Sequence, residues 1–244
     1  MRITAPTRAA ALLAVAVLPF ALTACSSGDS DGSAGSQGAA SSPSAAPTSH
    51  NPDEGLATGA DLKKALAPAS FFGAGYKVDP DGVRDTGTSF QKQSADPAAP
   101  AKPDCTKFGG TSWIALTGDE GVSFAQNDYV NDDSSADIAQ EIDVFRGTTA
   151  TTVMRHLRKV VAACPTYKDA DTKSVVKVAG TAASGLGDEA YAITLTDPTW
   201  TNGTTLIAVR KGTAVVSIMS TDGHDNGAAT AKKLAAKVTA AVTG

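Results

Sequence analysis

The sequence predicts an α+β domain in which a mainly antiparallel β-sheet packs against two longer helices and one short N-terminal helix. Three observations predict this class. Short runs of alternating polar and apolar residues recur between residues 112 and 220, as in half-buried strands. Turns or a tight hairpin join most of these runs, so neighbouring strands are expected to run antiparallel. Two apolar stripes at helical spacing supply helices that cover the sheet.

A basic and then apolar segment opens the chain of 244 residues. Arg2 and Arg8 precede an apolar run over residues 9–21, which is too short to span a bilayer comfortably and is flanked like a signal peptide. Residues 1–24 are therefore expected to be the signal peptide. Small residues and then Cys25 close the segment, which resembles the lipobox of bacterial lipoproteins. The resemblance implies cleavage before Cys25 and lipid on its thiol, with acyl chains such as palmitate. The implied location is extracytoplasmic, lipid-anchored to the outer face of the cell membrane.

Residues 25–58 combine this cysteine with a stretch rich in Ser, Gly, Ala, Pro and Asp. Few large apolar side chains occur there, so the segment cannot bury enough surface to offset chain entropy. We expect a disordered stalk. The single α+β domain is then expected to span residues 59–244.

Removal of the leader leaves 19 of the 21 basic residues against 25 acidic ones. A mildly acidic protein is a poor candidate for binding nucleic acid or for polybasic attraction to anionic lipid. The partners expected are the membrane, through the lipid anchor, and a small apolar ligand or an envelope protein.

In the first half of the domain, a short helix over residues 61–66 stops at Pro68. Gly, Pro and Asp make residues 73–102 mostly loop, with a short strand around 89–91. After Gly147, Thr148 or Thr149 can cap a helix that runs to Cys164 along a complete apolar stripe. The longer strands of this half are expected over residues 112–117, 122–129 and 141–145.

In the second half, Pro165 ends that helix and four strands follow before a final helix. Lys211 and Gly212 join the last two strands as a tight hairpin, because glycine readily adopts positive φ. The strands are expected over residues 174–178, 189–196, 204–210 and 213–220, and the helix over residues 228–242.

Three cysteines occur in the chain. With Cys25 lipidated, Cys105 and Cys164 remain as an even pair in an oxidising compartment, so we expect a disulfide. Two buried free thiols are the alternative. No cofactor is expected and no metal site either, because the cysteines are far apart and His50, His156 and His224 show no ligand spacing around them.

Five features of the sequence together resemble one family. They are the short opening helix, the Cys105-to-Cys164 frame, the helix segment 153–164, the segment 185–191 before a strand and the Ala-rich closing helix. Over about residues 59–244 the chain resembles the extracellular sensor-like domain of actinobacterial serine/threonine kinases of the PknH type and its lipid-anchored relatives. The resemblance implies a non-enzymatic domain with a central antiparallel sheet and a cleft for an unidentified ligand. The chain differs in having no kinase domain and no second pair of exported cysteines.

No catalytic set is expected. None of the histidines has an evident partner, and no serine stands in the Gly-x-Ser-x-Gly frame of a nucleophile elbow. Four aspartates lie between the end of the strand at 122–129 and the next strand. They are interpreted as part of a solvated loop, with a Ca²⁺ site as the alternative. They are Asp128, Asp132, Asp133 and Asp137.

Trp200 is the one residue proposed to bind a ligand, because it lies in the turn-rich loop 197–203 between two strands. The alternative is that it folds back over the sheet edge. A cleft, if present, is expected between the sheet and the helix over residues 149–164, with Trp200 at its rim. Trp113 is expected in the core.

The function expected is that of a lipid-anchored, non-catalytic binding or sensor-like protein of the cell envelope. Two alternatives stay open. One is an envelope hydrolase with an unrecognised site, and the other is a structural or partner-docking lipoprotein.

Overall fold

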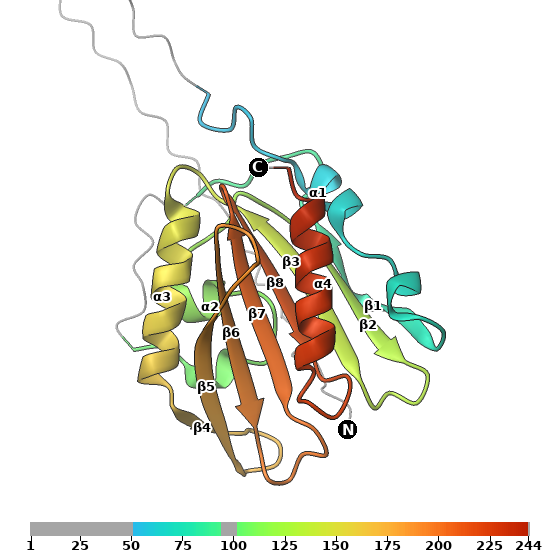
Figure 1. The fold of residues 1–244 in the computed structure, drawn as a ribbon. Helices are drawn as coiled ribbons and strands as arrows, with labels where there is room; N and C mark the ends of the chain where they lie inside the picture. The colour runs from blue at the N-terminus through green and yellow to red at the C-terminus, as the bar shows by residue number, and fades with distance from the viewer. Residues whose placement is uncertain (1–50, 94–101, 244) are drawn as a thin grey trace, which may run out of the picture. The chain divides into compact units, whose positions relative to one another are not determined.

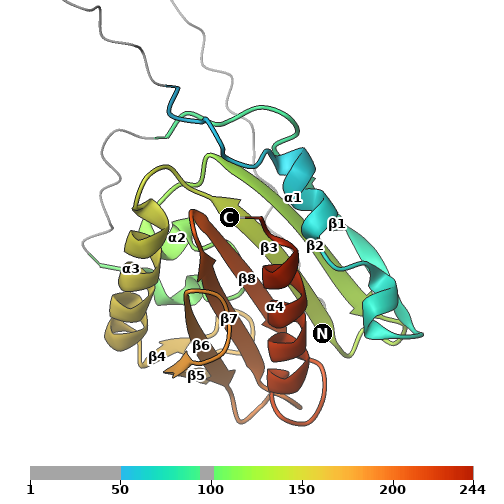
Figure 2. The ribbon, with the colours of Figure 1, turned by 45° about the horizontal axis from the view of Figure 1, so that its top comes forward.

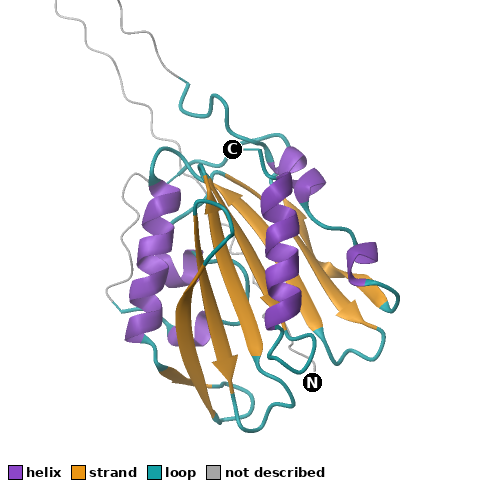
Figure 3. Cartoon of the chain, viewed as in Figure 1, coloured by secondary structure: helices purple, strands orange, loops and turns teal. Residues whose placement is uncertain are grey.

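A computed structural model describes residues 51–93 and 102–243 of the chain. Within this part, an antiparallel sheet of eight strands carries helices on both faces (Figures 1 and 3), so the predicted α+β class is confirmed. The predicted signal peptide, Cys25 and most of the predicted stalk lie outside the described residues. None of the helices within the described ranges is long and apolar enough to cross a membrane.

The strand order is β1-β2-β3-β8-β7-β6-β5-β4, and every neighbouring pair is antiparallel. The chain leaves β3 through a helix, reaches the far edge at β4 and returns strand by strand until β8 pairs with β3. The strands are β1 (Tyr76–Asp85), β2 (Ser123–Asn131), β3 (Asp137–Val144), β4 (Thr166–Lys168), β5 (Val175–Ala183), β6 (Glu189–Thr196), β7 (Thr204–Lys211) and β8 (Ala214–Ser220).

Two separate hydrophobic cores lie on opposite faces of the sheet. Helices α1 and α4 cover one face, and α2 and α3 cover the other (Figure 2). Successive side chains of β8 belong to different cores, since Val216 packs on the α4 side and Val215 on the α3 side. The helical elements are α1 (Gly59–Ala65), α2 (Ile114–Thr117), α3 (Thr149–Ala163), α4 (Ala228–Ala241) and the 3₁₀ turns η1 (Ala69–Phe72) and η2 (Cys105–Lys107).

Helix α3 buries the whole apolar stripe predicted for it. Its first turn carries no side-chain cap, because the Thr148 hydroxyl makes no capping hydrogen bond. Burial against the sheet therefore holds this helix in place more than its N-terminal capping does. The buried residues are Ala150, Val153, Met154, Leu157, Val160 and Val161.

Three sequence predictions are wrong, all in the first half of the domain. The short strand predicted around residues 89–91 does not form, and these residues are loop. Residues 112–117 form no strand but contain the one-turn helix α2, which ends at Gly118 in the left-handed conformation with φ 76°. Residues 76–85, predicted as loop, form strand β1. Pro80 and Gly82 made this segment look like loop in the sequence. An edge strand tolerates both residues where its hydrogen-bond ladder is interrupted, and here the register shifts between Asp79 and Arg84. Strand β4 was too short to predict.

The folded unit begins a few residues before Gly59, where its start was expected. The Asp53 carboxylate accepts a hydrogen bond from Arg146 Nε at 2.7 Å. The carbonyl of Ala57 accepts one from the Ser123 hydroxyl at 2.6 Å. These contacts tie residues 53–57 to the domain.

Candidate functional site

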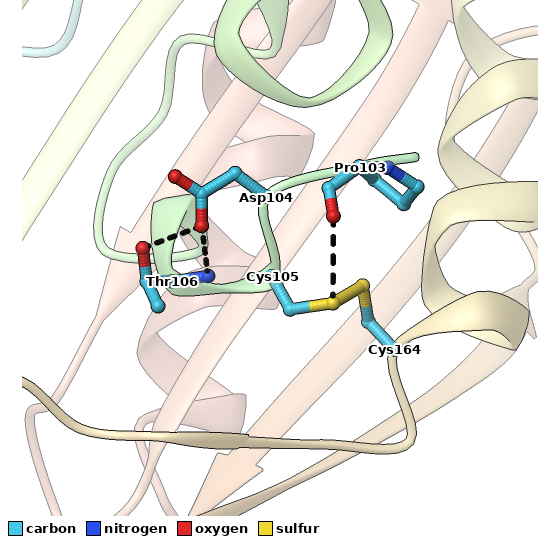
Figure 4. Close-up of a disulfide and its surroundings, with 5 residues drawn as sticks. All are labelled: Pro103, Asp104, Cys105, Thr106 and Cys164. Carbon is cyan, nitrogen blue, oxygen red and sulfur yellow. Dashed lines mark hydrogen bonds between the residues drawn. A yellow bond between two sulfur atoms is a disulfide. The ribbon is translucent and has the colours of Figure 1, made fainter. Parts of the chain in front are cut away.

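The predicted disulfide is present and joins a loop to the end of α3 (Figure 4). The Cα atoms of Cys105 and Cys164 are 5.6 Å apart. Asp104 caps η2, because its carboxylate accepts hydrogen bonds from the Thr106 amide at 3.1 Å and hydroxyl at 2.7 Å. On the other side, the Cys164 amide donates to the last turn of α3. The bond therefore fixes the loop over one end of the α3-side core.

Trp200 lies in the loop between β6 and β7 and is half-buried against the α3-side core. Asp197 organises this loop, since it accepts hydrogen bonds from the Thr199 amide at 2.7 Å and from the Ser174 hydroxyl. Phe108 and Tyr167 stack at 6.4 Å between ring centroids, beside the disulfide loop, and pack with the same core. We call Trp200, these two rings and the disulfide, all of which pack with the α3-side core, the aromatic margin; Trp200 is partly exposed.

Helix α3 packs directly on the sheet. Val153, Met154 and Leu157 are fully buried, and they share one core with Ile193 and Leu206. Core side chains thus fill the space in which a cleft was expected. Binding at Trp200 would have to use the margin of the core and not its interior.

A pair of carboxyl groups lies on the α3-side face of the sheet, beneath the loop that contains Thr111. Glu141 and Asp143 are two residues apart on β3, so their side chains point to the same face. Glu141 is buried and accepts a hydrogen bond from the Thr111 hydroxyl at 2.8 Å. Burial raises the pKa of Glu141. Burial, then the charge of Glu141 and a hydrogen bond to it, raise the pKa of Asp143 well above its usual value. Ionisation of either acid therefore disfavours ionisation of the other.

Asp128 on β2 extends this polar area. Both of its oxygens accept hydrogen bonds from the Gln126 amide, at 2.9 and 3.1 Å, and Gln126 in turn accepts one from Arg84 at 2.5 Å. Burial raises the pKa of Asp128 to about 6, although the Gln126 hydrogen bond and the Arg84 charge oppose this shift. Asp128 is thus separated from the solvated loop with which the sequence grouped it.

The pKa of Asp128 predicts a pH dependence. Because the folded-state pKa of about 6 lies above 3.8, stability from this group falls as pH rises between these values. Asp128→Asn should remove that loss. We compare the change in the free energy of unfolding between pH 4 and pH 7 in the two proteins. After allowance for solvent screening, this change should be about 1–2 kcal/mol more favourable to the folded state in Asp128→Asn than in the unmodified protein. Urea unfolding at both pH values measures this, with the exposed Asp132→Asn as control. An equal pH dependence in all three proteins would contradict it.

The four aspartates of the predicted acidic loop do not converge. Asp133 accepts a hydrogen bond from the Ser135 amide at 3.0 Å, while Asp137 opens β3. Within residues 51–93 and 102–243, no group of three or more His, Cys, Asp or Glu side chains is placed to hold a metal ion.

His156 has a partner that the sequence did not reveal. Its Nδ1 atom lies 2.9 Å from the carboxylate of Asp119, whose side chain is almost fully buried. This resembles the base and orienting carboxylate of a hydrolytic triad. Among the described residues, however, no hydroxyl or thiol is hydrogen-bonded to His156, so the nucleophile of such a triad is missing.

A small open cavity of about 390 Å³ lies on the opposite face, between the loop 185–188 and α4. Lys211 lines it, but its ammonium already donates to the carbonyls of Thr239 at 3.1 Å and Val242 at 2.6 Å. The cation caps the end of α4 and is not free to bind an anion. The loop Gly185-Leu186-Gly187-Asp188 thus serves as a structural turn next to this helix end.

The sequence predicts a strand over residues 141–145, but it did not reveal the carboxyl pair on it. The local alternation is correct, since Ile142 and Val144 are core residues. The loop that covers Glu141 arrives from residue 111, thirty positions earlier. Paired acids two apart on a strand were the one available signal.

Comparison with known proteins adds no assignment, because neither a protein-family model nor a curated protein matches the chain.

Proposed function

We propose that the chain is a lipid-anchored protein of the cell envelope whose α+β domain binds a ligand or partner without turning it over. The observation that carries the proposal is the Cys105–Cys164 bond. Such bonds persist in oxidising compartments and are rare in the cytosol, so it supports export. The leader ending at Cys25 supports lipid attachment. The antiparallel sheet agrees with what the resemblance to the PknH-type sensor-like domain leads one to expect.

The binding surface that we propose is the aromatic margin beside the disulfide. Trp200 is held there by a hydrogen-bonded loop, so little chain entropy would be lost on binding. An indole that is part buried and part exposed suits an apolar or amphipathic envelope molecule. Phe108 and Tyr167 belong to the same core and stack on each other there.

Tryptophan fluorescence tests this surface. Trp113 is buried, so a ligand-induced change should come from Trp200. Titration with vesicles of envelope lipid extract should give a saturable change that Trp200→Ala abolishes. Val175→Ala removes another exposed apolar side chain, 54% exposed, and should leave the change intact. The proposed surface is wrong if no saturable change occurs, or if Trp200→Ala retains it.

An envelope hydrolase is the second candidate, and the buried carboxyl pair of Glu141 and Asp143, both with raised pKa values, is the observation in its favour. Hydrolysis of an ester, glycan or peptide substrate, lost on both Glu141→Gln and Asp143→Asn, would replace the binding proposal. We expect no turnover, because the Thr111 loop covers Glu141, which is 4% exposed.

A further inference from the structure

The two outer edges of the sheet are protected to different degrees. Strand β1 carries Pro80, a register shift between Asp79 and Arg84, and charged side chains along its length. These features discourage pairing with another strand. At the opposite edge, β4 is only three residues long and pairs only with residues 175–177 of β5.

Beyond β4, strand β5 presents free backbone groups. The Val178 amide donates outward to the Pro165 carbonyl at 3.0 Å. Because backbone groups alternate along a strand, the N–H and C=O groups of Gly180 and Ala182 point the same way. In the described part of the chain these two outward amides have no partner. Residues 179–182 are exposed and uncharged, so they carry none of the charges that usually protect an edge strand. We name residues 178–183 the β5 edge.

Helix α3, which carries Arg155 and Arg158, lies beside the β5 edge (Figure 1). A Cβ atom on Gly180 would come within 2.7 Å of Val161 of this helix. One turn earlier, Arg158 lies 5.5 Å from the ring centroid of Tyr191, which is in register with Ala182. Arg155 shares this flank of α3 and is exposed. Arg158 is paired with Glu189, whereas Arg155 makes no ion pair among the described residues.

We propose that the β5 edge accepts an extended acidic segment of another polypeptide as an added strand. Main-chain hydrogen bonds to Gly180 and Ala182 would hold the segment, and acidic side chains on alternate positions would face Arg155. A second copy of the chain, paired through the same edge, is the alternative occupant that the test has to separate. The inference rests on the proposed binding function but uses a surface separate from Trp200.

The probe is a short capped peptide of alternating Val and Glu, added to the purified protein. Binding is measured by calorimetry, and amide hydrogen exchange reports the site. We expect saturable binding with slowed exchange at Gly180 and Ala182. A matched peptide, N-methylated on the edge-facing amides, keeps its charge but loses its donors, and should bind about tenfold more weakly.

Two pairs of variants separate backbone pairing from charge. Ala182→Pro removes an outward amide and should weaken binding about tenfold, whereas Ala182→Val keeps the amide and should not. Arg155→Glu should weaken binding about fivefold. Lys232→Glu reverses an exposed charge on α4, on the opposite face of the sheet, and should have a smaller effect. Thermal unfolding confirms that each variant is folded.

Equal binding of the N-methylated peptide, equal binding by folded Ala182→Pro, or no saturable binding of the probe would overturn the inference. Self-association through β5, abolished by Ala182→Pro, would also overturn it in favour of a second copy. Fluorescence titration of Trp200 reports separately on the proposed function, so failure at one surface is distinguishable from failure at the other.

Discussion

Removal of the Cys105–Cys164 bond should lower the free energy of unfolding by about 2–5 kcal/mol. The bond joins residues 59 positions apart, so it restricts a long loop of the unfolded chain. It also fixes η2 against the end of α3, where Phe108 and Tyr167 pack. The double variant Cys105→Ala, Cys164→Ala avoids leaving a free thiol, and urea unfolding followed by tryptophan fluorescence measures the change.

Reductant provides the control for this prediction. Dithiothreitol should lower the stability of the unmodified protein by a similar amount and leave the double variant unchanged. A loss below about 0.5 kcal/mol in both comparisons would show that the bond contributes little to stability.

Trp113→Ala should cost about 3–5 kcal/mol, the second large effect. Trp113 is 3% exposed and its indole N–H donates to the Ser217 hydroxyl at 2.5 Å. The substitution removes the largest side chain of this loop and leaves the buried Ser217 without that donor. It would also loosen the loop that covers Glu141, since Thr111 lies two residues away.

The neighbouring residue is the matched control for Trp113. Ile114 is 43% exposed, and Ile114→Ala should cost less than about 1 kcal/mol in the same unfolding assay. Similar losses for the two variants would mean that the loop is not anchored through the indole.

The parts of the fold that could be predicted from sequence are those with strong periodicity. Helix α3 and strand β6 follow from the spacing of their apolar residues. The hairpin follows from Gly212, which has a φ of 58° in the structure. Strand β1 could not be predicted, because an edge strand with interrupted pairing tolerates the residues that normally indicate loops. Helix α2 could not either, since a four-residue apolar run fits one helical turn as well as a short strand.

The candidate site shows the same limit. The disulfide could be predicted from counting cysteines and assigning a compartment, without any geometry. Partners such as Asp119 for His156 and Thr111 for Glu141 depend on how the loop over residues 102–122 folds onto the sheet. The β5 edge could not be predicted either, because only the strand order shows that β4 leaves half of the outer side of β5 unpaired.

The most direct test of the central claim is the intact mass of the mature protein together with the mass of its N-terminal peptide. The account predicts a chain that begins at Cys25, carries a diacylglycerol group on that thiol and fractionates with membranes. Cys25→Ala should lose the lipid and release the protein from membranes or block its processing. An unmodified Cys25 in a protein found in the soluble fraction would contradict the account.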